Sequence, residues 1–114
     1  MGSDNSRLPI YLSDVNKELD SVSLSTTATT VWTPASGKYA RALRLTISVD
    51  SAVAIKIIDS SGGELWRSGT LSADHSYTFD FGHGLYDGEA DGDMEIATVS
   101  GTATAQGTLS GVEL

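Results

Sequence analysis

Short runs of alternating hydrophobic and polar residues dominate the chain, and the clearest extends from Tyr39 to Val49. The alternation places one set of side chains toward a core: Tyr39, Leu43, Leu45, Ile47 and Val49. The opposite face then carries a smaller or more polar set: Ala42, Arg44, Thr46 and Ser48. A period of two is typical of a strand that is buried on one face only.

A second alternating run covers residues 53 to 58, and a third covers residues 64 to 71. Between them, the stretch Asp59-Ser-Ser-Gly-Gly63 has the composition of a turn, because glycine adopts positive φ and Asp and Ser bond their own backbone. Residues 52 to 71 are therefore predicted to form a β-hairpin.

Further strands are predicted over residues 22–24, 29–33, 76–82, 94–99 and 102–112, with a turn at 72–75. Alternation in residues 76–82 places Tyr77, Phe79 and Phe81 on one face, as the largest aromatic contribution to the core. The last strand is rich in Ala, Thr and Gly, which favours an edge or a position beneath a close neighbour. Many short strands predict one antiparallel β-sandwich over residues 21–114, either jelly-roll-like or immunoglobulin-like.

Residues 1–20 have a different character, and we interpret them as an N-terminal extended arm. They contain an apolar segment without periodicity, formed by Leu8, Pro9, Ile10, Tyr11 and Leu12. A short helix from Ser13 to Glu18 is the alternative, with Ser13 as its cap. Exposed apolar residues on an arm indicate a partner-binding role, although an arm folded onto its own sheet also fits the sequence.

Composition narrows the possible partners. The 114 residues carry a formal charge of −8, and basic side chains form no stripe, which argues against nucleic acid and against an anionic membrane surface. The chain has no cysteine, so disulfides, Cys-ligated zinc and thiol catalysis are excluded. It shows neither a classical signal pattern nor an apolar run long enough to span a bilayer, so we expect a soluble protein.

The stretch Tyr86 to Glu95 raises the question of a metal site. Four of its carboxylates stand at alternate positions and are candidate calcium ligands: Asp87, Glu89, Asp91 and Asp93. Counted from Asp87, an EF-hand requires a bidentate Glu at the twelfth position, where Thr98 stands instead. A looser calcium loop stays open, but a solvated hairpin loop without a cofactor is the favoured interpretation.

Other catalytic chemistry has little basis in the sequence. His75 and His83 are each expected at a turn, at opposite ends of one strand, too far apart to share a metal. The chain contains no G-x-S-x-G motif on a strand-to-helix turn and no phosphate-binding glycine loop before a helix. We therefore expect a protein that is not an enzyme.

Trp66 is the tryptophan expected to be exposed, since it shares its strand face with Glu64 and Ser68. An exposed Trp on a hairpin indicates a protein-protein anchor. Stacking on a sugar is the alternative.

The run VWTPASGKYARALRLTISVDSAVAIKIID resembles small β-sandwich virion proteins of tailed bacteriophages and related viruses. The segments FDFGHGL (79–85) and GTLSGVE (107–113) are similar to the same group, so the likeness covers residues 22–114. The acidic loop at 87–93 departs from the group, which more often has a neutral loop there. The resemblance implies a non-enzymatic virion component, such as a capsid decoration protein, a head-fibre base or a tail-associated module.

The functional hypothesis is a capsid decoration or cement protein, located in the virion. It would bind the major capsid protein or other virion proteins as a homo-oligomer, with a trimer favoured because it matches local capsid symmetry. A calcium-assisted carbohydrate-binding module and a tail or head-fibre adaptor are the alternatives.

Overall fold

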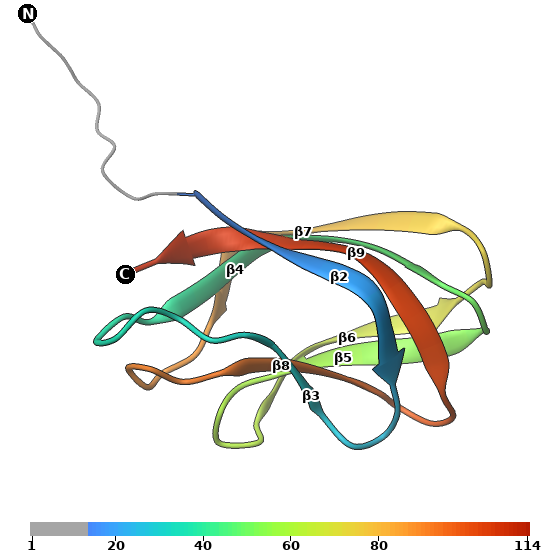
Figure 1. Cartoon of the computed structure of the whole chain (residues 1–114), viewed down its shortest axis with the longest axis horizontal. Coiled ribbons are helices and arrows are strands. Elements are labelled where there is room, and N and C mark those ends of the chain that lie inside the picture. Colours follow the sequence, from blue (N-terminus) through green and yellow to red (C-terminus); the bar gives the residue numbers. More distant parts are fainter. Residues whose placement is uncertain (1–13) are drawn as a thin grey trace, which may run out of the picture.

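The computed structural model describes residues 14–114, and in this part of the chain it contains eight β-strands (Figure 1). Their bounds are β2 (Asp14–Leu24), β3 (Thr29–Trp32), β4 (Ala40–Val49), β5 (Val53–Ile58), β6 (Glu64–Leu71), β7 (Ser76–Tyr86), β8 (Met94–Thr98) and β9 (Ala103–Glu113). No helix among the described residues is long and apolar enough to cross a membrane. The predicted hairpin over residues 52–71 is confirmed as β5 and β6.

The strands form two antiparallel four-stranded sheets, which confirms the predicted β-sandwich. The first sheet has the order β2-β9-β4-β7, and the second has the order β3-β8-β5-β6. Strands pair from the two ends of the chain inward, as β2 with β9, β3 with β8, β4 with β7 and β5 with β6. This is one long antiparallel ribbon rolled into two sheets, which is the jelly-roll arrangement. Of the two sandwich types that the sequence allowed, the topology selects the jelly roll.

The rolled ribbon gives the sandwich two distinct ends. One end, which we call the terminal end, is formed by Leu114 and by the loops 33–39, 59–63 and 87–93. Strand β2 also begins there. Figure 1 shows the start of β2 and the C-terminus at this end. The opposite end, which we call the distal end, is formed by the loops 25–28, 50–52, 72–75 and 99–102.

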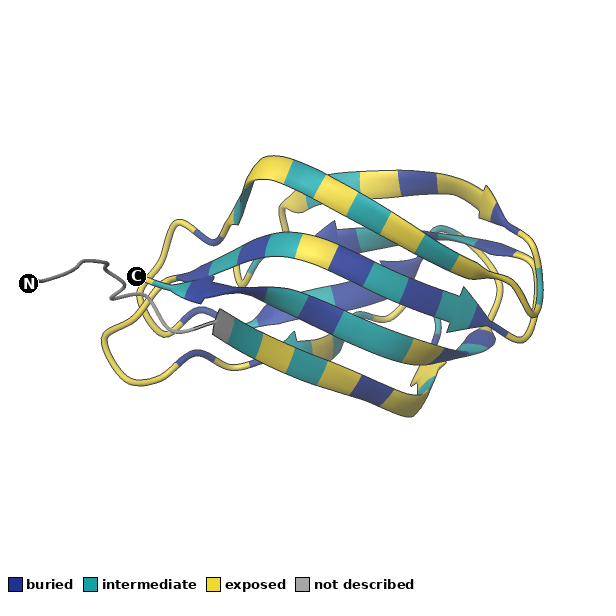
Figure 2. Cartoon of the chain, turned by 90° about the horizontal axis from the view of Figure 1, so that it is seen from above, coloured by how far each residue is buried: buried dark blue, intermediate teal, exposed yellow. Residues whose placement is uncertain are grey.

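The core between the sheets is mainly aliphatic. Its largest fully buried side chains come from both sheets and are Trp32, Leu24, Leu45, Ile47, Ile55, Ile57, Met94, Ile96 and Leu109. Buried and exposed positions alternate along most strands, as the striped ribbons of Figure 2 show. Removal of this apolar surface from water is the main force that holds the two sheets together.

Strand β9 lies in the interior of the first sheet, between β2 and β4. Of the two predicted positions, an edge or a place beneath a close neighbour, the structure shows the second. A Cβ atom on Gly107 would collide with the carbonyl of Thr46, and one on Gly111 would collide with that of Arg41. Small residues in β9 are therefore needed so that its neighbours can approach.

A β-bulge at Leu43 changes which residues of β4 face the core. The register of β4 shifts between Ala42 and Arg44 against both β7 and β9. Ala42 is buried, Leu43 is only partly buried, and Tyr39 is 42% exposed. The predicted placement of Tyr39 and Leu43 on the core face was wrong, because an extra residue in one strand reverses the alternation beyond it.

The aromatic residues of β7 contribute less to the core than predicted. Tyr77, Phe79 and Phe81 are partly buried and pack against its margin. Trp66 of β6 lies 4.8 Å from Phe79 and 5.1 Å from Phe81, between ring centroids. These rings join the neighbouring edges of the two sheets, and Trp32 is the aromatic side chain of the core itself.

The N-terminal boundary also differs from the prediction. Residues 14–20, expected in the arm, belong to β2, and residues 14–19 pair with β9. The alternative helix from Ser13 to Glu18 is replaced over residues 14–18 by this strand. Residues 1–13, with the apolar segment of the arm, lie outside the described residues.

Candidate functional site

The acidic loop at the terminal end is held by its first carboxylate. Asp87 is only 2% exposed, and its side chain accepts hydrogen bonds from the backbone N–H of Ser60 (2.9 Å), the Ser60 hydroxyl (3.1 Å) and the N–H of Glu89 (3.0 Å). The favoured interpretation of a wholly solvated loop was therefore wrong for Asp87. A buried carboxylate needs several donors, and here they come from the β5–β6 turn and from the loop itself.

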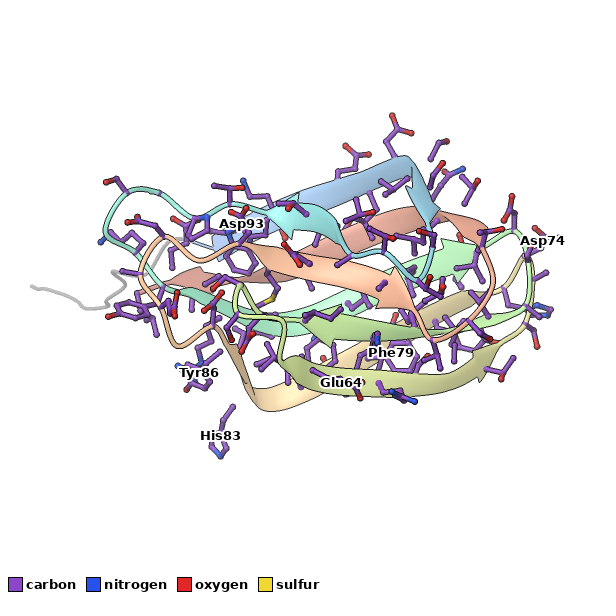
Figure 3. All side chains as sticks on the ribbon, turned by 90° about the horizontal axis from the view of Figure 1, so that it is seen from below. Glu64, Asp74, Phe79, His83, Tyr86 and Asp93 are labelled. Carbon is purple, nitrogen blue, oxygen red and sulfur yellow. The ribbon has the colours of Figure 1, made fainter. Side chains whose placement is uncertain are left out.

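The other carboxylates of the loop do not converge on a common point. Asp91, at φ +65°, accepts a hydrogen bond from the N–H of Gly37, while Glu89 is exposed. Asp93, labelled in Figure 3, is partly exposed. Within residues 14–114, no group of three or more His, Cys, Asp or Glu side chains is placed to hold a metal ion. Of the alternating acids, Asp87 and Asp91 each bind donors of a different loop, at Ser60 and at Gly37.

Two further carboxylates fix loops at the same end. The N–H and hydroxyl of Ser61 and the N–H of Gly63 all donate to Asp59, and these bonds, the Ser61 hydroxyl first, lower the pKa of that carboxyl. Glu113 accepts hydrogen bonds from the indole N–H of Trp32 (2.9 Å) and the N–H of Ala35 (3.1 Å). The indole bond is the main reason why the pKa of Glu113 is lowered. Donors to a carboxylate favour its charged form.

The motifs that resemble virion proteins meet in space at this end. Trp32, from the WTP segment, packs under Gly111 and donates to Glu113, both from the closing GTLSGVE segment. Gly82 and Gly84 of the FDFGHGL segment adopt positive φ in a wide bulge of β7, where four residues face one residue of β4. These motif residues therefore specify packing and backbone geometry.

The two histidines lie apart, with His75 directly before β7 and His83 within it. His75 lies in the distal turn, where its Nδ1 is 2.9 Å from the carbonyl of Ala73. His83 is exposed within the bulge of β7 rather than at a turn, which corrects the prediction, and its side chain points away from the sandwich in Figure 3. Trp66, expected to be an exposed anchor, is partly buried against Phe79 and Phe81, so its ring is largely occupied within the chain.

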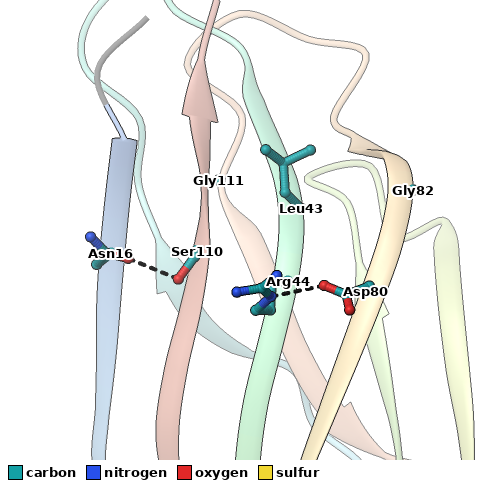
Figure 4. Close-up of a pocket in the computed structure, with 7 residues that line it drawn as sticks. All are labelled: Asn16, Leu43, Arg44, Asp80, Gly82, Ser110 and Gly111. Atoms are coloured by element: carbon teal, nitrogen blue, oxygen red, sulfur yellow. Dashed lines mark hydrogen bonds and ion pairs between the residues drawn. The ribbon is translucent and has the colours of Figure 1, made fainter.

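The outer face of the first sheet carries a hollow. It measures about 440 Å³ and is lined by residues of all four strands (Figure 4): Asn16, Leu43, Arg44, Asp80, Gly82, Ser110 and Gly111. Arg44 donates to Asp80 (2.8 Å), and Ser110 donates to Asn16 (2.8 Å). The bulges in β4 and β7 produce the recess, so the alternation pattern gave no signal for it.

A second surface feature is a patch of exposed apolar side chains at the terminal end. Tyr86 is 45% exposed, Tyr39 is 42% exposed and Leu114 is 38% exposed, and they are the large hydrophobic side chains exposed in the described structure. Tyr39 and Leu114 exchange two backbone hydrogen bonds of 2.9 Å, and Tyr86 pairs with Arg41, two residues after Tyr39. The Arg41 guanidinium carbon lies 4.7 Å from the centre of the Tyr86 ring.

Similarity to known proteins is found among solved structures. No protein-family model matches the chain, and no curated protein sequence matches it. Among solved structures, the crystal structure of the SPBc2 prophage-derived protein YomS is similar, with 13% identity and a TM-score of 0.39 over 92% of this chain and 99% of that chain. A phage-derived protein is therefore among the structures to which this chain is similar.

Proposed function

We propose that the chain is a non-enzymatic structural protein of a virion, with capsid decoration or cementing as its role. The single observation that supports this most is the jelly-roll pairing of eight strands into two four-stranded sheets, an architecture that recurs in viral capsid domains. Fold alone does not assign function, because lectins and cupins share it, so the proposal needs support from side chains.

That support comes from how the polar groups of the terminal end are used. The carboxylates of Asp59, Asp87 and Glu113 bind backbone and side-chain donors of neighbouring loops, so they stabilise loop geometry. A rigid end with exposed tyrosines suits attachment to another protein, since Tyr supplies a large contact area at a small cost in conformational entropy. The partner in this proposal is the major capsid protein, and the protein acts as a homo-oligomer, with a trimer favoured because a closed ring fits local capsid axes.

Quantitative mass spectrometry of particles purified from the source tests this proposal. We expect the protein in the particle fraction at a fixed ratio to the major capsid protein, after a salt wash that removes loosely adsorbed proteins. Antibody labelling by electron microscopy then separates capsid from tail or fibre. Recovery only in the soluble fraction of the lysate would contradict a virion role.

Glycan binding at the hollow of the first sheet is a second candidate function. Asn16, Arg44, Asp80 and Ser110 offer amide, guanidinium, carboxylate and hydroxyl groups across one row of the sheet, and Leu43 adds an apolar surface beside them. Such a set can bond adjacent hydroxyls of a sugar, and the volume suits one or two sugar residues. The site uses neither the acidic loop nor Trp66.

A glycan array read with the intact protein and with Asp80→Ala tests this second function. We expect the intact protein to bind some glycans of the array. Asp80→Ala should lose this binding, whereas the matched distal variant Asp74→Ala should keep it. A calcium chelator should leave the binding unchanged. An array without any bound glycan would remove this candidate and leave the virion proposal in place.

A further inference from the structure

The exposed apolar side chains of the described structure are concentrated at one place rather than scattered. Tyr39, Tyr86 and Leu114 all belong to the terminal end: Tyr39 directly precedes β4, Tyr86 ends β7 and Leu114 directly follows β9. The outer face of the same sheet is polar toward the distal end, where neighbouring strands present Thr46, Thr78 and Thr108. A local apolar patch on a charged chain indicates a binding site for an apolar segment.

The same end is where the undescribed part of the chain joins the sheet. Strand β2 begins at Asp14, which pairs with Val112, and Val112 pairs with Arg41, which in turn pairs with Tyr86. Asp14 and Tyr86 are thus in one row, three strand spacings or about 14 Å apart. Thirteen residues precede Asp14, and they include the apolar segment Leu8 to Leu12.

We propose that Leu8–Leu12 of a second copy of this chain binds the patch formed by Tyr39, Tyr86 and Leu114. This inference rests on the homo-oligomer of the proposed function and names the contact that closes it. Five extended residues span up to about 17 Å, which matches the width from β2 to β7. Each copy gives one segment and receives one, so the contact repeats around a closed ring.

The segment is assigned to a second copy because the proposed function is a homo-oligomer, and an exchanged segment would join its copies. The chain's own segment is the competing occupant, and the disulfide experiment distinguishes the two. Charge also favours the contact, because Arg7 precedes the segment and the exposed Glu89 follows closely after Tyr86.

Engineered cysteines test this contact cleanly, because the chain has none of its own. Two single variants, Ile10→Cys and Tyr86→Cys, are mixed and oxidised, and the products are identified by peptide mass spectrometry. We expect a disulfide between the two variants within the mixture, and covalent rings from the double variant. The control replaces Tyr86→Cys by His75→Cys, an exposed position at the distal end.

Three results would overturn the inference. An intrachain disulfide in the double variant without cross-links in the mixture means that the segment binds its own copy. Cross-links no more abundant than with His75→Cys mean that the patch does not receive the segment. A solution mass that stays oligomeric by light scattering in a chain lacking residues 1–13 means that another surface holds the copies together.

The outcome is separable from that of the proposed function. Cross-links of the expected kind in a protein absent from purified particles would contradict the virion role and keep the arm exchange. A protein present in particles without those cross-links would contradict the arm exchange alone.

Discussion

The two ends of the sandwich are built from the same kind of element, loops between antiparallel strands, yet they use their polar groups differently. At the terminal end, Asp87 is buried and bonded to two loops, and Glu113 bonds the core indole of Trp32. At the distal end, Asp50 accepts a single bond from the N–H of Thr104 at the surface (2.7 Å). The comparison teaches that the loop after Tyr86 is anchored by a buried carboxylate, whereas the distal loops are held by backbone and hydroxyl groups, such as the Thr98 hydroxyl that donates to the carbonyl of Gly101.

The largest expected difference between the ends concerns two glycines. Gly111→Ala places a methyl group against the carbonyl of Arg41 and the ring of Trp32, so we expect a loss of at least about 3 kcal/mol in the free energy of unfolding. Gly101→Ala, at the distal end, places its methyl group in ordinary van der Waals contact with Val53 (3.8 Å) and is strained only by φ +80°, so we expect about 1 kcal/mol. Urea unfolding measures both. Equal losses would mean that the terminal end is not more tightly packed.

The next effect concerns the carboxylates. Asp87→Ala leaves the N–H groups of Ser60 and Glu89 without their acceptor, and we expect a loss of about 2 kcal/mol. Asp50→Ala removes one exposed bond and is expected to cost about 0.5 to 1 kcal/mol. Thermal unfolding of the two variants beside the unaltered chain checks the ratio. A larger loss for Asp50→Ala would reverse the comparison.

The sequence predicted the strand faces correctly where apolar and polar residues alternate without a break, and wrongly where a bulge interrupts the alternation. The hairpin over residues 52–71 followed from alternation and turn composition, because nothing disturbs β5 and β6 enough to hide the pattern. At Leu43 the bulge reverses the faces, so Tyr39 was placed in the core and became instead part of the exposed patch. A bulge depends on two partner strands at once, and a single run of residues does not reveal it.

The candidate sites show the same limit. The acidic loop was visible as a run of carboxylates, but the burial of Asp87 depends on Ser60, 27 residues earlier in the chain. Trp66 was read as exposed from its neighbours Glu64 and Ser68, whereas Phe79 and Phe81 from the other sheet cover it. The hollow beside Leu43 arises where four strands meet, and no local motif signals it.

Acid should act on the terminal end through Glu113. The Trp32 bond lowers the pKa of Glu113 in the folded chain, so this carboxylate contributes stability above its unfolded pKa of about 4.3. That contribution is lost as the pH falls through the lower, folded pKa. We expect Glu113→Gln to unfold more easily at pH 7 and to show a shallower loss of stability below about pH 5. The charge-matched variant Glu18→Gln, on the exposed face of β2, serves as control, and an equal flattening there would argue against Glu113.

The smallest effect is expected at the hollow, which lies on the sheet between the two ends. Arg44 and Asp80 form an ion pair of 2.8 Å, but both side chains are mostly exposed, so water and salt screen their attraction. We expect Arg44→Ala to change the free energy of unfolding by less than about 0.5 kcal/mol, with little dependence on salt. Chemical unfolding at low and high ionic strength measures this change. A loss above about 1 kcal/mol would show that the pair stabilises the bulges beside it, whereas a negligible loss leaves both side chains free to bind a ligand without cost to the fold.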